Sequence, residues 1–177
     1  MLRMVRLGMY SIVLAIALVA APALQAQQPN GAPAAPVPAP IITGKTAFIS
    51  NAGMDSMSVA VFRNAGDPDQ PYNDFYAAMK SWGRYKLVAN PADADLVFEI
   101  RFTAPLTDCG KLTTYDPQLD LTIVDAKTHF TLWSLTEPVN GAMRKETWKK
   151  NVTQGTASLI NDVKKLSAQP LATPAAN

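Results

Sequence analysis

The alternation of apolar and polar residues predicts two strands in the middle of the chain. Apolar residues recur at every second position from Asp95 to Phe102 and from Gln118 to Asp125, so each segment is expected to bury one side. The residues expected to face inward are Leu96, Phe98, Ile100, Phe102, Leu119, Leu121 and Ile123. Shorter strands are predicted for Lys45 to Ser50, Arg84 to Val88 and His129 to Leu135. Residues 57–63 fit either a short strand or a short helix.

Apolar residues spaced three and four apart predict two helices. The first has Asp69 as its N-cap and Pro71 in its first turn, and Gly83 ends it. Its apolar stripe is Tyr72, Phe75, Tyr76, Met79 and Trp82. The second runs from about Arg144 to Leu166, with Trp148, Val152, Gly155, Leu159, Val163 and Leu166 on one stripe. Both stripes bury best on one face of a mixed sheet, which gives an α/β fold, an α+β two-layer sandwich ordered β-α-β-β-β-α.

The first 26 residues have the pattern of a secretory signal peptide. Arg3 and Arg6 precede an unbroken apolar run over residues 12–21, and small residues follow. We expect cleavage after Ala26, with Ala23 as the second choice and an uncleaved anchor as the third. A spanning helix needs roughly 20 apolar residues, and Pro22 ends this run well short of that. The predicted product is exported, periplasmic or secreted, with no stable membrane span after processing.

Composition divides the remaining chain into three parts. Residues 27–42 form a predicted Pro/Ala-rich linker, since five of the fourteen residues from 27 to 40 are Pro and none is charged. Residues 43–166 form one α/β domain of ordinary size. Residues 167–177 resemble the linker in composition and are predicted to be a disordered tail.

The charge balance argues against a nucleic-acid partner. The chain has 16 Lys and Arg against 14 Asp and Glu. Because Arg3 and Arg6 lie in the signal, the remainder carries 14 charges of each sign, whereas nucleic-acid binders carry a basic patch. A single cysteine and a single histidine exclude an internal disulfide framework and a Cys-rich zinc module. We therefore predict no catalytic residue, no cofactor and no metal site.

Two chemical possibilities remain open beside this prediction. Carboxylates are the one group that can still support catalysis, and a small carboxylate-dependent hydrolase of the periplasm is the alternative function. The candidates for such a pair are Asp93 with Asp95, Asp108, Asp116 and Asp120. Structural roles are favoured over catalysis for three of them: Asp93 and Asp95 cap turns and begin a strand, and Asp120 balances Arg101 across the solvent face. Cys109 is either a buried thiol or a free thiol that forms an intermolecular disulfide.

The hairpin after Asp125 suggests a partner surface. A four-residue loop from Ala126 to His129 places His129 in the left-handed region, which histidine tolerates better than most residues. The register that follows from this loop opposes Ile123 with Leu132 and Thr122 with Trp133. One apolar patch then lies on the face away from the helices, formed by Val97, Val124, Trp133 and Leu135. Two alternatives are that the segment around Ile41 and Ile42 covers this patch, or that the register differs by one residue.

Three segments resemble a known group of envelope domains. They are Ala94 to Ile100 (ADLVFEI), Leu121 to Thr128 (LTIVDAKT) and Leu132 to Ser134 (LWS). This pattern resembles the small α/β domain at the amino terminus of TolB and the related domains of lipoprotein activators of penicillin-binding proteins and curli-secretion lipoproteins. His129 stands where that group usually has glycine, and the lipid-attachment cysteine is absent. The resemblance implies a non-catalytic binding or scaffolding module that docks other envelope proteins, and it is compatible with a homodimer.

The signal peptide leads to a direct prediction about the mature chain. Protein recovered from its producing cell is expected to begin at Gln27, as measured by intact mass and amino-terminal sequencing. Cleavage at the second site would give a chain that begins at Leu24. A chain that retains Met1 to Arg6 in the mature protein would contradict cleavage.

Overall fold

The computed structural model describes residues 35–55, 58–59, 66–110 and 113–171. The predicted signal peptide, the first half of the predicted linker and most of the ambiguous segment 57–63 therefore lie outside the described residues. Within the described ranges, no helix combines the length and the apolar character that a membrane crossing requires.

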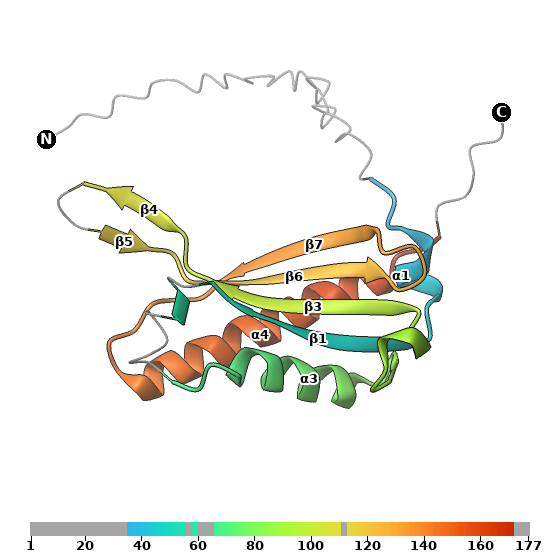
Figure 1. The fold of residues 1–177 in the computed structure, drawn as a ribbon, viewed down its shortest axis with the longest axis horizontal. Helices are drawn as coiled ribbons and strands as arrows, with labels where there is room; N and C mark the ends of the chain where they lie inside the picture. The colour runs from blue at the N-terminus through green and yellow to red at the C-terminus, as the bar shows by residue number, and fades with distance from the viewer. Residues whose placement is uncertain (1–34, 56–57, 60–65, 111–112, 172–177) are drawn as a thin grey trace, which may run out of the picture. The chain divides into compact units, whose positions relative to one another are not determined.

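A mixed five-stranded sheet forms one layer of the domain, with the strand order β2-β1-β3-β6-β7 (Figure 1). The strands are β1 (Thr46–Met54), β2 (Lys86–Leu87), β3 (Leu96–Thr103), β6 (Gln118–Asp125) and β7 (Thr131–Pro138). Strand β1 pairs in parallel with β2 and β3, whereas β3–β6 and β6–β7 are antiparallel. Each predicted strand is present, β6 with the predicted ends and the other four with shifted ends, and the predicted fold class is confirmed.

Two helices, α3 (Gln70–Trp82) and α4 (Lys145–Ser167), cover one face of this sheet (Figure 1). We call this face the inner face and the opposite one the outer face. Gly83 ends α3 as predicted, because its φ of 68° is left-handed and its N–H donates to the Met79 carbonyl at 3.1 Å. Asp69 precedes α3, but its side chain makes no capping hydrogen bond. Its carboxylate instead accepts from the Asn51 amide at 3.2 Å.

The core lies between the inner face and the two helices. All seven predicted inward residues of β3 and β6 are buried, as are all six residues of the predicted α4 stripe. Aromatic rings join the layers: the Phe75 and Phe98 centroids lie 6.3 Å apart, and those of Phe102 and Trp148 lie 5.9 Å apart. Gly155 allows α4 to approach the sheet closely, because a Cβ there would lie 3.2 Å from a Val139 methyl carbon.

The predicted linker boundary at residue 42 is wrong. A short helix, α1 (Ala39–Thr43), includes the last four residues of the predicted linker. Ile41 in this helix and Val37 ahead of it are buried in the core. The Tyr85 hydroxyl donates to the Ile41 carbonyl at 2.6 Å, and the Arg84 guanidinium donates to the carbonyls of Ile42 and Gly44. The folded domain therefore includes these residues, which the Pro-rich composition concealed.

Two further differences concern the ends of elements. A small hairpin of β4 (Leu106–Cys109) and β5 (Thr113–Tyr115) was not predicted, and it extends beyond one end of the main sheet (Figure 1). Between β2 and β3 the chain forms the 3₁₀ helix η1 (Pro91–Asp93), and the Asn90 side chain accepts a hydrogen bond from the Ala92 N–H at its start. Helix α4 includes Ser167, so the predicted tail overlaps its last residue, while residues 172–177 lie outside the described part.

The loop between β6 and β7 has the predicted geometry. His129 has a φ of 61°, and no other non-glycine residue in the described ranges has a positive φ. Its N–H donates to the Asp125 carbonyl at 2.8 Å, and the Asp125 N–H donates to the Phe130 carbonyl at 3.0 Å. His129 is exposed, so its role in this loop is conformational.

We expect His129→Gly to leave the protein as stable as the original chain or to stabilise it by up to about 1 kcal/mol, because glycine adopts the left-handed region without the Cβ penalty. Chemical denaturation measures this change, with His129→Val as a matched control that should lose stability. A clear loss of stability in the glycine variant would contradict a purely conformational role.

Candidate functional site

The register between β6 and β7 decides which residues lie on the outer face. Val124 pairs with Thr131 as predicted, but a bulge at Leu132 then shifts the pairing by one residue. Ile123 therefore pairs with Trp133, where the prediction had Leu132. Such a shift moves every following side chain to the other face of the sheet.

The predicted patch of Val97, Val124, Trp133 and Leu135 is consequently divided. Val97 and Val124 pair with each other and lie half-buried on the outer face. Trp133 and Leu135 pair with the buried Ile123 and Leu121, so they share the inner face and contact the core. The prediction of one continuous outer patch from these four residues is wrong. The sequence also allowed a register that differs by one residue. The pairing of β6 with β7 has that register from Ile123 and Trp133 onward.

The outer face carries an apolar row across three strands. Phe48 of β1 pairs with Val97 of β3, which pairs with Val124 of β6, so the three side chains are neighbours on one face. All three are half-buried. Sequence reasoning missed Phe48 because the parallel register of β1 and β3 cannot be read from either strand alone.

A shallow hollow of about 780 Å³ includes part of this row. Phe48 and Val97 line it, and Lys127, Glu99 and His129 provide its polar contacts. The remaining lining comes from Ser50, Pro91, Ala92 and Ala126. Helices α3 and α4 both lie on the inner face of the sheet (Figure 1), opposite the face that carries Phe48 and Val97. We call this hollow with its apolar row the outer-face groove.

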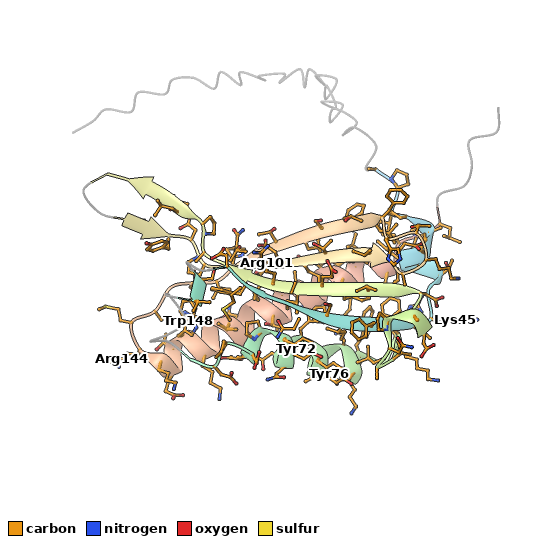
Figure 2. All side chains as sticks on the ribbon, in the orientation of Figure 1. Lys45, Tyr72, Tyr76, Arg101, Arg144 and Trp148 are labelled. Atoms are coloured by element: carbon orange, nitrogen blue, oxygen red, sulfur yellow. The ribbon has the colours of Figure 1, made fainter. Side chains whose placement is uncertain are left out.

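The next rows of the outer face are polar. Glu99 pairs with Thr122, and Arg101 pairs with Asp120. The Asp120 carboxylate does not form an ion pair with Arg101. It accepts hydrogen bonds from Thr103, Thr136 and Gln118, at 2.6, 2.8 and 3.3 Å. Figure 2 shows Arg101 toward the end of β3 that lies next to the β4–β5 hairpin.

A second hollow, of about 350 Å³, contains two of the acidic residues near the start of β1. Asp95 and Asp125 line it together with Lys45 and Lys127, and Lys45 is labelled in Figure 2. One Asp95 oxygen accepts from the N–H groups of Lys45 and Thr46 at 2.9 and 3.1 Å, and the other lies 4.0 Å from the Lys127 ammonium.

The backbone hydrogen bonds in this hollow determine the charge of both carboxylates. The N–H groups of Lys45 and Thr46 lower the pKa of Asp95. Those of Thr128 and Lys127 likewise lower the pKa of Asp125. Both groups are therefore ionised at neutral pH. Asp125 closes its own loop, whereas Asp95 connects the start of β3 to the start of β1. The Asp108 side chain lies outside the described part of the structure, and of the other four candidates, Asp93, Asp95, Asp116 and Asp120, only Asp95 lines this hollow.

A third hollow, of about 470 Å³, lies where α3 and α4 begin. Gln70, which is 6% exposed, donates to Asp74, to the Lys149 carbonyl and to Thr153. Thr153 in turn donates to Asp74 at 2.8 Å. These bonds connect the two helices, so the polar groups of this hollow hold the fold together.

The remaining candidates are the Cys109 thiol and a metal site. Cys109 ends β4, but its side chain lies outside the described part of the structure, so its two roles stay predictions. In the described ranges, no group of three or more His, Cys, Asp or Glu residues is placed to hold a metal ion.

Comparisons with known proteins bear on the fold. No protein-family model matches the sequence, and no curated protein matches it significantly. A DUF4136 family protein from Bacteroides thetaiotaomicron has a TM-score of 0.50 at 11% identity, over 73% of this chain and 92% of that one. A DUF330 protein from Xanthomonas campestris has a TM-score of 0.48 at 11% identity, over 78% and 93%. A minor lipoprotein from Acinetobacter baumannii has a TM-score of 0.40 at 16% identity, over 73% and 97%. The likeness to the DUF4136 protein shows a similar fold, and the resemblance to TolB stays a prediction.

The Asp95 interaction gives a prediction with a definite pH dependence. Asp95→Ala removes an acceptor shared by two N–H groups, so we expect a loss of about 1 kcal/mol at neutral pH. Because folding lowers the pKa of Asp95, its contribution is present above the unfolded pKa of about 4 and is lost as the pH falls through the folded value.

Denaturation at several pH values tests this expectation. The stability difference between the original chain and Asp95→Ala should shrink in acid. Asp93→Ala is the matched control, because Asp93 is exposed in the adjacent η1 turn. A difference that stays constant from neutral to strongly acidic pH would show that the charge on Asp95 is irrelevant.

Proposed function

We propose that the protein is an exported, non-catalytic binding or scaffolding module of a bacterial cell envelope. In this proposal the outer-face groove meets the partner. The main support for this proposal is the apolar row of Phe48, Val97 and Val124. These side chains lie half-buried on a sheet face that neither α3 nor α4 covers. Apolar surface of this kind, rimmed by polar groups, is typical of interaction sites.

The chemistry of the groove indicates the kind of partner. Phe48 and Val97 give it an apolar lining, and Glu99 and Lys127 add one charge of each sign. The chain from Gln27 onward carries 14 charges of each sign, so long-range attraction contributes little to recognition. A polypeptide segment with an apolar side chain and flanking polar groups fits this surface best.

The geometry supports a binding role over the hydrolase alternative. A glycosidase-like pair needs one carboxyl group with a raised pKa, to act as the general acid. Asp95 and Asp125 share one hollow, but their pKa values are both lowered by backbone hydrogen bonds. Two ionised carboxylates already occupied by backbone N–H groups suit a structural role.

The assignment to the envelope is supported by the sequence. A charged start, an apolar run and small residues before Ala26 form an export signal. The resemblance of the strand and hairpin motifs to envelope domains points to the same compartment.

Site-specific photocrosslinking in the producing cell tests the proposal. A photoreactive residue at Val97 is expected to give one defined protein adduct, whereas the same residue at Lys80, exposed on α3, should not give it. Adding Phe48→Glu should reduce the Val97 adduct by about tenfold, because a buried unpaired charge costs more than 1.4 kcal/mol.

Circular dichroism would confirm that the Phe48→Glu chain still folds. The same products from both positions, or no product from Val97, would count against the outer-face groove as a docking surface.

A further inference from the structure

Strand β7 is a free edge of the main sheet. It stands last in the strand order, beside β6, and no strand of the described part pairs with its other side (Figure 1). With eight residues it is far longer than the other edge strand, β2, which has two. A long free edge presents unpaired backbone N–H and C=O groups to any second strand.

The pairing with β6 shows which backbone groups point outward. Antiparallel pairs alternate between hydrogen-bonded and non-hydrogen-bonded. The bonds from Asp125 to Phe130 and from Val139 to Pro117 fix that alternation from both ends of the hairpin. Ser134 and Thr136 fall in non-hydrogen-bonded pairs, so their N–H and C=O groups point away from β6. No backbone hydrogen bond reaches these groups from the residues that the structure describes.

Two features limit the length of edge that a second strand can use. Pro138 also falls in a non-hydrogen-bonded pair, and it has no N–H to offer. At the other end, the bulge at Leu132 interrupts the regular ladder. Between these limits the edge has no lysine, arginine or proline, and its one charged residue is Glu137. Natural edge strands usually carry such blocking residues along their length, so this stretch is open.

We propose that β7 pairs antiparallel with β7 of a second copy of this chain, to form a two-fold dimer with a continuous ten-stranded sheet. A strand edge paired antiparallel with itself is self-complementary, as a two-fold interface requires. A two-fold axis at Leu135 places the outward groups of Ser134 opposite those of Thr136 of the second copy. At each end of the new ladder, the Leu132 bulge of one copy lies opposite Pro138 of the other. The two copies therefore pair only over the open stretch between these residues.

The side chains on the edge support a second copy as the occupant. Trp133 and Leu135 are half-buried on the inner face and contact the core from one side only. In the paired sheet, Leu135 lies next to its own equivalent and Trp133 lies opposite Glu137 of the second copy. The apolar inner face is thus continued across the axis, and no like charges face each other along it.

Disulfide trapping tests the register directly. On the axis, the two Leu135 Cα atoms would lie about 4.5 Å apart in a non-hydrogen-bonded pair, which suits a disulfide. Leu135→Cys in a Cys109→Ser background, in the chain from Gln27, is expected to form a covalent dimer under mild oxidation. Thr131→Cys in the same background is the control, because its two copies would lie more than about 20 Å apart.

A second pair of variants tests the backbone bonds. Ser134→Pro removes only an outward N–H, which edge strands tolerate, and should weaken dimerisation by about tenfold or more. Ser134→Ala keeps that N–H and should leave the dimer unchanged. Light scattering over a series of micromolar concentrations measures both, and circular dichroism confirms folding.

Several outcomes would overturn the proposal. One is a monomer at every concentration without trapping at residue 135. Another is equal trapping at residues 131 and 135, and a third is a dimer that Ser134→Pro leaves intact. Because these experiments use the purified chain alone, they are independent of whether the outer-face groove binds a partner.

Discussion

The one-sided burial of strands β3 and β6 is the constraint on which the rest of this structure depends. Their inward residues, such as Phe98 and Leu121, are fully buried against α3 and α4, and each such side chain contributes about 1.5–3 kcal/mol relative to an exposed one. The aromatic contacts, the close approach at Gly155 and the Gln70 network all serve to keep the two helices on that face. Since both main helices lie on one side, the opposite face and the β7 edge remain for intermolecular contacts.

Much of this arrangement could be predicted from the sequence, because an element that buries one side has apolar residues at regular intervals. The period of two in β3 and β6 and the helical stripe of α4 determined the layers. The left-handed His129 followed from the loop length. Neither α1 nor the β4–β5 hairpin was predicted. Helix α1 has only five residues and begins in a Pro-rich segment, and it is held by Tyr85 and Arg84, which are distant in sequence.

The candidate site was harder to predict, for a physical reason. Leu132 and Trp133 are adjacent apolar residues, so either one can occupy the inner position opposite Ile123. A bulge lets the strand place Trp133 there, and nothing local to β7 favours one arrangement over the other. Phe48 was missed because its neighbours on the outer face come from pairing between distant segments. Sequence periodicity thus reports which residues are buried more reliably than how strands are aligned.

The attachment of α1 has a mechanical consequence. The chain enters the domain through Val37 and Ile41, which are inserted in the core, and Tyr85 and Arg84 hold the carbonyls of Ile41, Ile42 and Gly44. A pulling force on the chain ahead of residue 37 therefore acts first on this attachment, before it reaches β1. If the amino-terminal end is tethered, tension is transmitted to the segment between α3 and β2, and β1 is loaded through its own chain only after α1 has been extracted.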